Sequence, residues 1–242
     1  MRKIYDYVIV LSVIFLLLAC GTEDSKKDKE PNEVDTIKND EDISKPIIDS
    51  NFKIDISKID GFTDKNLIEE QYLAVMNYVR SLSIKCNDKA GFSGPSKPLI
   101  WDILLSNAAK EHSEDMQISG VYSHLGSATS SDITGEALGR ASTFSERINA
   151  TGYVGGSGEN IATVGKGFKT STGRPTTFIE TVDSNRWIGI MEEWIVSEEG
   201  HCSNIMNPIH KSVGMFKKGV FKKIEGENTF FFTYWTQEFG VK

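Results

Sequence analysis

The stretch WIVSEEGHCSNIMNP, residues 194–208, places a histidine between a glycine and a cysteine at what reads as the end of a helix. Gly200 stands where a helix C-cap is expected, and a glycine there lets the chain turn sharply. The histidine that follows, His201, has two interpretations. It is either a site residue presented from a loop or a polar neighbour of a disulfide formed by Cys202, and the rest of the chain has to decide between them.

Helices are predicted mainly before this stretch and strands mainly after it. Apolar residues at every third or fourth position predict helices over residues 66–83, 99–118 and 181–197, and one or two helical turns over 144–150. β-branched and aromatic residues predict strands over 161–164, 212–223 and 229–238, with a turn at 225–228 and a loop over 127–139. Because a sheet covered by helices buries the apolar faces of both, we expect a layered α+β domain.

The first 50 residues differ in character from the rest. Two positive residues followed by a short apolar run predict an export signal over residues 1–19, because that run is shorter than the about 20 apolar residues that span a bilayer. The letters LLAC at 17–20 resemble the lipobox of bacterial lipoproteins, which implies cleavage before Cys20 and lipidation of that cysteine. Residues 20–50 are charged and poor in apolar side chains, which predicts a flexible, lipid-anchored linker. Residues 51–242 are then long enough for one folded domain.

The chain is acidic, with a net charge of −7 and a pI of about 5.2. This balance argues against nucleic acid as a partner, because contact with a phosphate backbone favours a basic surface. Together with the lipobox, it leads us to expect a protein of the bacterial cell envelope, anchored in the membrane through lipid on Cys20. The expected place is the outer membrane or the cell surface.

Three cysteines become an even pair once Cys20 is assigned to lipid. Cys86 and Cys202 then remain in a domain expected to be exported, where disulfides persist. We predict a Cys86–Cys202 disulfide. The alternative is that Cys202 is a thiolate nucleophile paired with the neighbouring His201, which would leave Cys86 unpaired.

Seven short motifs occur in one order along residues 67–240: PLIWDILLSNAAKEHSEDM, SHLGS, ERINATGY, GENIA, EEWIVSEEGHCSNIMNP, VGMF and YWTQEFG. This order resembles the CAP superfamily, also called SCP-like, which includes cysteine-rich secretory and pathogenesis-related proteins. Its bacterial branch is the most similar. The resemblance implies a three-layer α–β–α sandwich with a central antiparallel sheet and an open cleft that holds two histidines and two acidic residues.

The motifs place three of the four implied cleft residues. The histidines correspond to His124 in SHLGS and His201 in GHC, and the first acid corresponds to Glu159 in GENIA. Many family members carry the second acid three residues after the helix tryptophan, where this sequence has Ser197. Glu193, one turn earlier, and Glu198, directly after it, are the two carboxylates that could replace it.

Other polar and aromatic residues have simpler interpretations. Glu159 itself could be structural and accept backbone N–H groups in its loop. His112 lies on the apolar stripe of a helix and is predicted to be a core histidine, whereas His210 is predicted to be exposed. Asn204 and Asn207 are expected to fix the loop after Cys202. The side chains that could line the cleft are Tyr122, Trp194 and Gln237.

Three functions remain open for such a cleft. The favoured one is a tethered binding module that takes a small apolar or envelope-derived ligand or a partner, as some relatives bind lipids or sterols. The second is a metal-assisted, peptidase-like hydrolase, because neutral His124 and His201 could hold zinc or another divalent cation. The third is a host- or surface-facing interaction protein with a vestigial cleft. The sequence shows neither a nucleophile elbow nor a His-Glu-x-x-His motif, so an enzyme is the less favoured reading.

Overall fold

A four-stranded sheet forms the centre of the domain in the computed structural model, which describes residues 48, 50–63, 67–169, 186–225 and 228–242. The strands lie in the order β1 (Ile100–Trp101), β3 (Ser212–Glu225), β4 (Asn228–Gly240) and β2 (Gly156–Lys169). β4 pairs antiparallel with both β2 and β3 over almost its whole length. The described residues belong to one compact unit that ends at Lys242. The predicted signal (1–19) and all but two residues of the predicted linker (20–50) lie outside the described residues.

The sheet is mixed, which corrects the expectation of a purely antiparallel one. β1 pairs parallel to the start of β3, through Ile100 opposite Ser212 and Trp101 opposite Val213. Parallel pairing needs a long connection, and the chain from α2 to α6 lies between these two strands. β1 ends after two residues because the Asp102 carboxylate accepts the backbone N–H of Leu104 at 2.8 Å and starts a helix.

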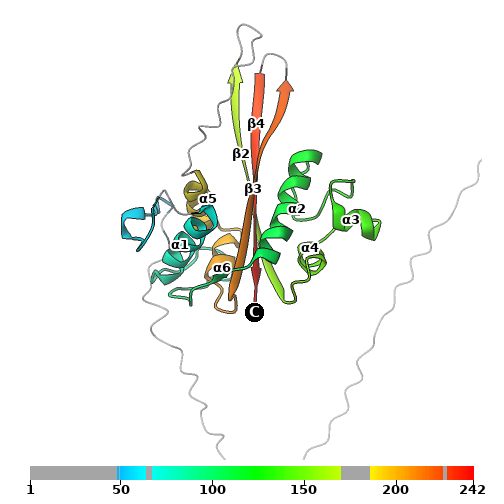
Figure 1. The fold of residues 1–242 in the computed structure, drawn as a ribbon. Coiled ribbons are helices and arrows are strands. Elements are labelled where there is room, and N and C mark those ends of the chain that lie inside the picture. The colour runs from blue at the N-terminus through cyan, green and yellow to red at the C-terminus, as the bar shows by residue number, and fades with distance from the viewer. Residues whose placement is uncertain (1–47, 49, 64–66, 170–185, 226–227) are drawn as a thin grey trace, which may run out of the picture. The chain divides into compact units, whose positions relative to one another are not determined.

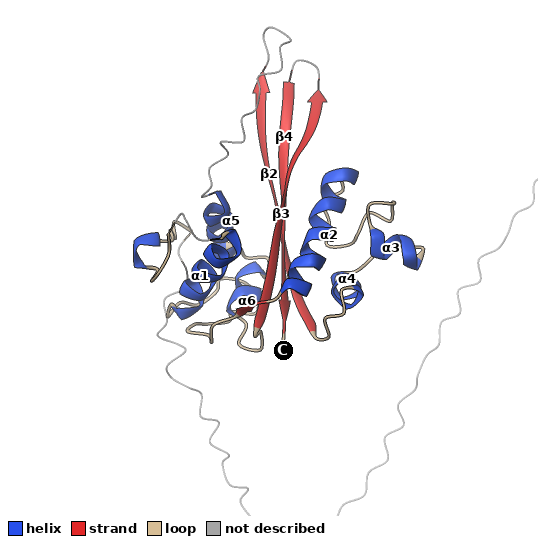
Figure 2. Cartoon of the chain, viewed as in Figure 1, coloured by secondary structure: helices blue, strands red, loops and turns tan. Residues whose placement is uncertain are grey.

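Helices cover both faces of this sheet, as Figures 1 and 2 show. The helices on one side are α1 (Ile68–Ser81), α5 (Arg186–Val196) and α6 (His201–Met206), and those on the other are α2 (Ile103–Ser119), α3 (Ile133–Leu138) and α4 (Phe144–Ala150). A 3-10 turn, η2 (Ile56–Lys58), precedes them. The predicted α+β fold with three layers is therefore confirmed. None of the helices in the described ranges is long and apolar enough to cross a membrane.

The largest core lies between α1, α5, α6 and one face of the sheet. Val75, Trp194, Cys202 and Trp235 are all buried there, each at most 2 % exposed. At about 25 cal/mol for each Å² of apolar surface removed from water, such side chains supply most of the drive to form this layer. A smaller core under α2 and α4 includes Leu105 and Ile148. The two cores hold the loops of the predicted cleft from opposite sides of the sheet.

α3 and β2 are among the elements that differ from their predictions. The predicted loop over 127–139 contains α3, which begins where Asp132 accepts the backbone N–H of Gly135 at 3.0 Å. The strand predicted over 161–164 extends from Gly156 to Lys169, because it pairs with β4 along that whole length. The small and polar residues of both elements give little helix or strand signal in the sequence. Residues distant in the sequence stabilise the two elements in the fold.

The chain after Gly200 is a helix rather than a loop. Gly200 has φ 91° and acts as the N-cap of α6, instead of the C-cap that its position predicted. The guanidinium of Arg80 binds the other end of α6 through the carbonyl oxygens of Ile205 and Asn207. His201 is thus the first residue of a short helix fixed at both ends.

Candidate functional site

His124 is held by a buried carboxylate. It lies in the loop after α2, and its Nδ1 is 2.8 Å from Oε1 of Glu159 on β2. The side chain of His124 is 55 % exposed, whereas that of Glu159 is 1 % exposed. An ionised carboxylate only accepts hydrogen bonds, so Nδ1 carries a proton, and Nε2 is an acceptor whenever the ring is neutral.

Arg147 completes the support of Glu159 from α4. Its Nη2 donates to Glu159 Oε2 at 2.6 Å and to the backbone carbonyl of His124 at 3.1 Å. The same guanidinium donates to Ser142 through Nη1. Both oxygens of Glu159 are therefore bonded to side chains, which corrects the interpretation that this carboxylate accepts backbone N–H groups.

Charge keeps Glu159 ionised in this buried place. Burial by itself would raise its pKa, but the hydrogen bond from His124 and the positive charge of Arg147 outweigh burial and lower the pKa to about 2. His112 packs behind the pair, with Nε2 at 2.8 Å from the carbonyl of Ser123 and 3.8 Å from Glu159 Oε2. Burial lowers the pKa of His112 to about 4, so this ring is neutral near pH 7. The predicted core position of His112 is borne out, and it also supports the site.

A second buried glutamate lies opposite Glu159 on the neighbouring strand. Glu238 on β4 is the register partner of Glu159 and is fully buried. Burial, together with the charge of Glu159, raises its pKa well above the usual value and so favours the protonated carboxyl group. Neither carboxyl oxygen makes a hydrogen bond of ordinary geometry to another described residue. The acid that accompanies Glu159 inside the domain is therefore one that the sequence analysis did not single out.

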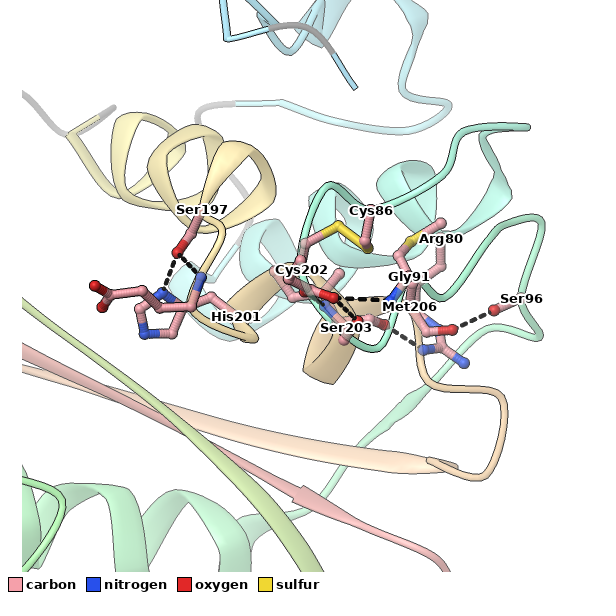
Figure 3. The surroundings of a disulfide bond; sticks show 12 residues. Arg80, Cys86, Gly91, Ser96, Ser197, His201, Cys202, Ser203 and Met206 are labelled. Atoms are coloured by element: carbon pink, nitrogen blue, oxygen red, sulfur yellow. Dashed lines mark hydrogen bonds between the residues drawn. A yellow bond between two sulfur atoms is a disulfide. The ribbon is translucent and has the colours of Figure 1, made fainter. Parts of the chain in front are cut away.

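His201 is held in a different way, at the junction of α5 and α6. Its Nδ1 is 3.0 Å from the hydroxyl of Ser197, which also accepts the backbone N–H of Glu199. Burial first, and then the nearby charge of His124, lower the pKa of His201. Figure 3 shows the ring turned toward Ser197, while Cys202 is turned away toward Cys86. His201 is thus presented away from the disulfide, and Ser197 bonds it from the position of the family's second acid.

Side chains from the segments of both histidines form hydrogen bonds to the edge strand β2. The hydroxyl of Tyr122 and the indole N–H of Trp194 both donate to the carbonyl of Ile161, at 3.2 and 3.1 Å. Tyr122 comes from the His124 side and Trp194 from the His201 side. Asn160 adds a link by donating from Nδ2 to the carbonyl of His201 at 3.2 Å. The segments that carry His124 and His201 therefore meet across one short segment of strand.

The other predicted cleft residues lie at its borders or outside it. Glu193 is exposed on α5, and Glu198 accepts from Asn87 at 3.1 Å. Gln237 is buried beneath β2, where its oxygen accepts from Asn160. Asn204, in α6 rather than in a loop, donates to the carbonyl of Glu159 at 3.0 Å.

His210 corrects another prediction, because it is 1 % exposed instead of lying at the surface. Its Nδ1 contacts the carbonyl of Asn204 at 2.9 Å and its Nε2 the hydroxyl of Ser157 at 3.1 Å. The ring also stacks on Phe239, with centroids 4.8 Å apart. It is a structural histidine that joins α6 to the sheet.

The predicted disulfide joins Cys86 to Cys202, with Cα atoms 5.6 Å apart. This bond excludes the alternative of a Cys202 thiolate paired with His201. Within the described residues, Cys86, Asp88 and Cys202 are the one group of three metal-binding side chains whose ligand atoms lie within 4.8 Å of one another. Because both sulfur atoms are in the disulfide and Asp88 accepts from Ser203 at 2.8 Å, these residues do not fit a metal ion.

Comparison with known proteins agrees with this architecture. The model of the cysteine-rich secretory protein family, CAP, matches residues 73–239. The chain belongs to the CAP family. A crystal structure of an extracellular protein containing an SCP domain from Bacillus anthracis str. Ames is 17 % identical with a TM-score of 0.42. That match covers 72 % of this chain and 40 % of the other, so the chain spans less than half of that protein's length. No curated protein matches the chain.

Two residues important to this CAP cleft were missed by the sequence reasoning. Arg147 stands in ERINATGY and Glu238 in YWTQEFG, both inside motifs that had been quoted. The only local signal was their place inside these motifs, since Arg147 follows Glu146 and Glu238 follows Gln237. Only the fold shows that both approach Glu159.

Proposed function

We propose that this CAP domain is a binding module of the bacterial cell envelope and that His124 and His201 form the polar end of its ligand cleft. The observation that supports it is the state of Glu159, which is buried, bonded through both oxygens and low in pKa. A general base works best with a pKa near the working pH. Glu159 is therefore better suited to orient His124 than to take a proton from water.

The surroundings of His124 favour an amphipathic ligand. Val121, Tyr122 and Leu125, the neighbours of His124 in its loop, are 45 %, 48 % and 52 % exposed. A polar ligand group could donate to Nε2 of His124 while an apolar chain covers these side chains. Binding sites commonly combine a few fixed polar groups with such apolar surface.

Export and tethering belong to the same proposal. The apolar run over 8–19 and the lipobox at Cys20 support secretion followed by lipid attachment. The Cys86–Cys202 disulfide is consistent with an oxidising compartment. The domain would then act at the outer membrane or the cell surface, at the end of a charged linker.

The test is to titrate the chain with a fluorescent fatty acid and with a lysophospholipid, and to assay peptide and cell-wall hydrolysis in parallel. Leu125→Ser should weaken amphiphile binding about tenfold, because it exposes apolar ligand surface. Ile100→Ser is the matched control, since Ile100 is also exposed but lies on β1. Hydrolysis that disappears in both His124→Ala and His201→Ala, with the fold retained, would favour the hydrolase. Absence of both binding and hydrolysis would favour the interaction protein.

A metal-binding function is the second candidate, and one contact favours it. Histidines that bind metals usually donate their other N–H to a carboxylate or carbonyl, as His124 does to Glu159. Nε2 atoms of His124 and His201 would hold the ion, which would supply Lewis-acid polarisation when bound. Zinc calorimetry on the chain and on His201→Ala tests it. Micromolar or tighter binding that is lost in the variant would support the metal site, and no heat in either protein would refute it.

A further inference from the structure

Three strands of the sheet continue beyond the helices that cover it. Figure 1 shows β2, β3 and β4 projecting past the ends of α1, α2 and α5. On the α2 side, the packed layer reaches as far as Met116 against Tyr234 and Phe232. We call residues 165–169, 219–225 and 228–232 the β extension. It measures about 16 Å along β2 and β4 and about 23 Å along β3, at about 3.3 Å per residue.

The charge of the β extension is opposite to that of the chain. It contains four lysines and one glutamate, a net charge of +3, in a chain of net charge −7, which leaves −10 for all other residues. The lysines are Lys166, Lys169, Lys222 and Lys223. Lys217 and Lys218 follow at its base, where they contact Trp235 and Glu114. The β extension is therefore a positive segment in an otherwise acidic chain.

The pairing register combines these lysines with phenylalanines. Lys166 on β2 and Lys222 on β3 both pair with Phe231 of β4. In the next row, Lys223 pairs with Phe230. The β extension contains five of the chain's 13 phenylalanines, at positions 168, 221, 230, 231 and 232. Lysine beside aromatic residues is the composition of segments that lie at a membrane surface, where cations attract lipid headgroups and aromatic rings enter the interface.

We propose that the β extension docks on an anionic phospholipid surface. The acidic remainder of the domain is repelled by the same surface, so the electrostatic field orients the extension toward it. Each lysine near an anionic leaflet strengthens binding by about fivefold, and the attraction decays within a Debye length. The interaction does not depend on the cleft or on lipidation of Cys20, and it goes beyond the proposed ligand-binding function.

The experiment measures sedimentation with vesicles of phosphatidylcholine containing about 30 % phosphatidylglycerol, and with phosphatidylcholine alone. The protein is the full chain with Cys20→Ser, so that no acyl chain contributes. The test variant carries Lys166→Gln, Lys222→Gln and Lys223→Gln. The matched control carries the same change at three exposed lysines outside the extension, Lys89, Lys97 and Lys211, and has the same net charge. Both are checked by circular dichroism.

The starting chain should bind the anionic vesicles and release them at about 0.5 M salt. The test variant should lose about 100-fold in affinity at three lysines of about fivefold each, while the control stays close to the starting chain. Equal losses in both variants would overturn the proposal, since they would assign binding to net charge. No loss in the test variant would also overturn it, leaving the lysines a role in keeping exposed strands from aggregating.

Two further readouts keep the test decisive. Hydrogen exchange on the starting chain should show new protection of backbone amides in residues 219–225 and 228–232 when anionic vesicles are added, and its absence there would overturn the proposal even if the variant misfolds. Duplex DNA is the competing polyanion. Binding to DNA that exceeds binding to the vesicles, and that depends on the same lysines, would replace the lipid surface with nucleic acid.

Discussion

His124 and His201, the two histidines of the candidate site, are held by opposite means. His124 rests on a buried ionic network, in which Glu159 accepts from its ring and Arg147 donates to both residues. His201 rests on packing and covalent structure: the Ser197 hydroxyl bonds its ring, and the next residue, Cys202, is in a disulfide. The part of the site around His124, the His124 half, is therefore fixed by charge. The part around His201, the His201 half, is fixed by chain connectivity.

This difference predicts which kind of change each half of the site is sensitive to. A buried ion pair is costly to leave half-formed, because removing one partner strands a charge in a medium of low polarity. A disulfide instead restricts the unfolded chain and is indifferent to pH in the ordinary range. We expect changes of charge to act on the His124 half and changes of connectivity to act on the His201 half.

The largest expected effect is the loss of the disulfide. Cys86→Ala with Cys202→Ala opens a loop of 116 residues in sequence separation. The chain-entropy model gives a loss of about 4–5 kcal/mol in the free energy of unfolding for so long a loop, measurable by urea denaturation. Hydrogen exchange should rise first in α6. Cys20→Ser is the control and should leave both readouts unchanged, and equal loosening around His124 would contradict the comparison.

The second largest expected effect on stability comes from removing the buried guanidinium of Arg147. Arg147→Met should lower the free energy of unfolding by about 3–5 kcal/mol, because Glu159 would stay buried without its guanidinium partner. The side chain of Arg147 is 1 % exposed. Arg140→Met, which breaks the exposed pair with Glu146, is the matched control and should have little effect on urea denaturation. An Arg147 variant as mild as the Arg140 variant would mean that the ionic network does not hold this half.

The layered fold could be predicted from signals in the sequence, and the family resemblance selected the candidate site residues. His124, Glu159 and His201 stand in short motifs, and helices such as α4 follow from apolar periodicity and capping residues within a few positions. These signals are local, so one chain displays them. The Cys86–Cys202 pairing followed from counting cysteines, because only two remained.

What the sequence could not predict depends on contacts between distant segments. From the sequence, Arg147 is expected to be a charged residue on the surface of a short helix. Only the fold brings Glu159 of β2 next to it. Glu238 sits where strand alternation allows an outward polar residue, and the register of β4 with β2 places it opposite Glu159 instead. His210 was predicted to be exposed because nothing local reveals that it stacks on Phe239.

A smaller effect, on the pH dependence of stability, tests the charge balance of the His124 half. The raised pKa of Glu238 means that its contribution is fully present below the unfolded glutamate pKa and is lost as pH rises through the folded value. The side chain of the Glu238→Gln variant cannot ionise, so it should flatten the decline in unfolding free energy above pH 5, which is at most about 1.4 kcal/mol for each pH unit. Urea denaturation between pH 5 and 8 measures it. Parallel curves for the two proteins would show that Glu238 is already ionised.

The contribution of Glu159 should have the opposite sign. Its pKa is lowered to about 2, so the stability that it adds is present above the unfolded glutamate pKa and is lost as pH falls toward 2. The wild type should therefore also weaken below about pH 4.3, the usual glutamate value. The Glu238→Gln variant should retain this acid-side loss. If Glu238→Gln removed the loss of stability at low pH as well as the one at high pH, the two glutamates would have to be treated as one titrating unit.

The smallest expected effect comes from restoring the family's second acid through Ser197→Glu. A carboxylate beside His201 stabilises the charged imidazolium and should raise its pKa, with little change in stability. Ser197→Gln is the neutral control of the same size, and NMR titration of the ring protons follows each histidine separately. If the His201 pKa rises and that of His124 stays in place, the two halves are independent across β2. If both move, the nearby charge that already lowers the pKa of His201 couples them, and a ligand that binds one histidine must alter the protonation of the other.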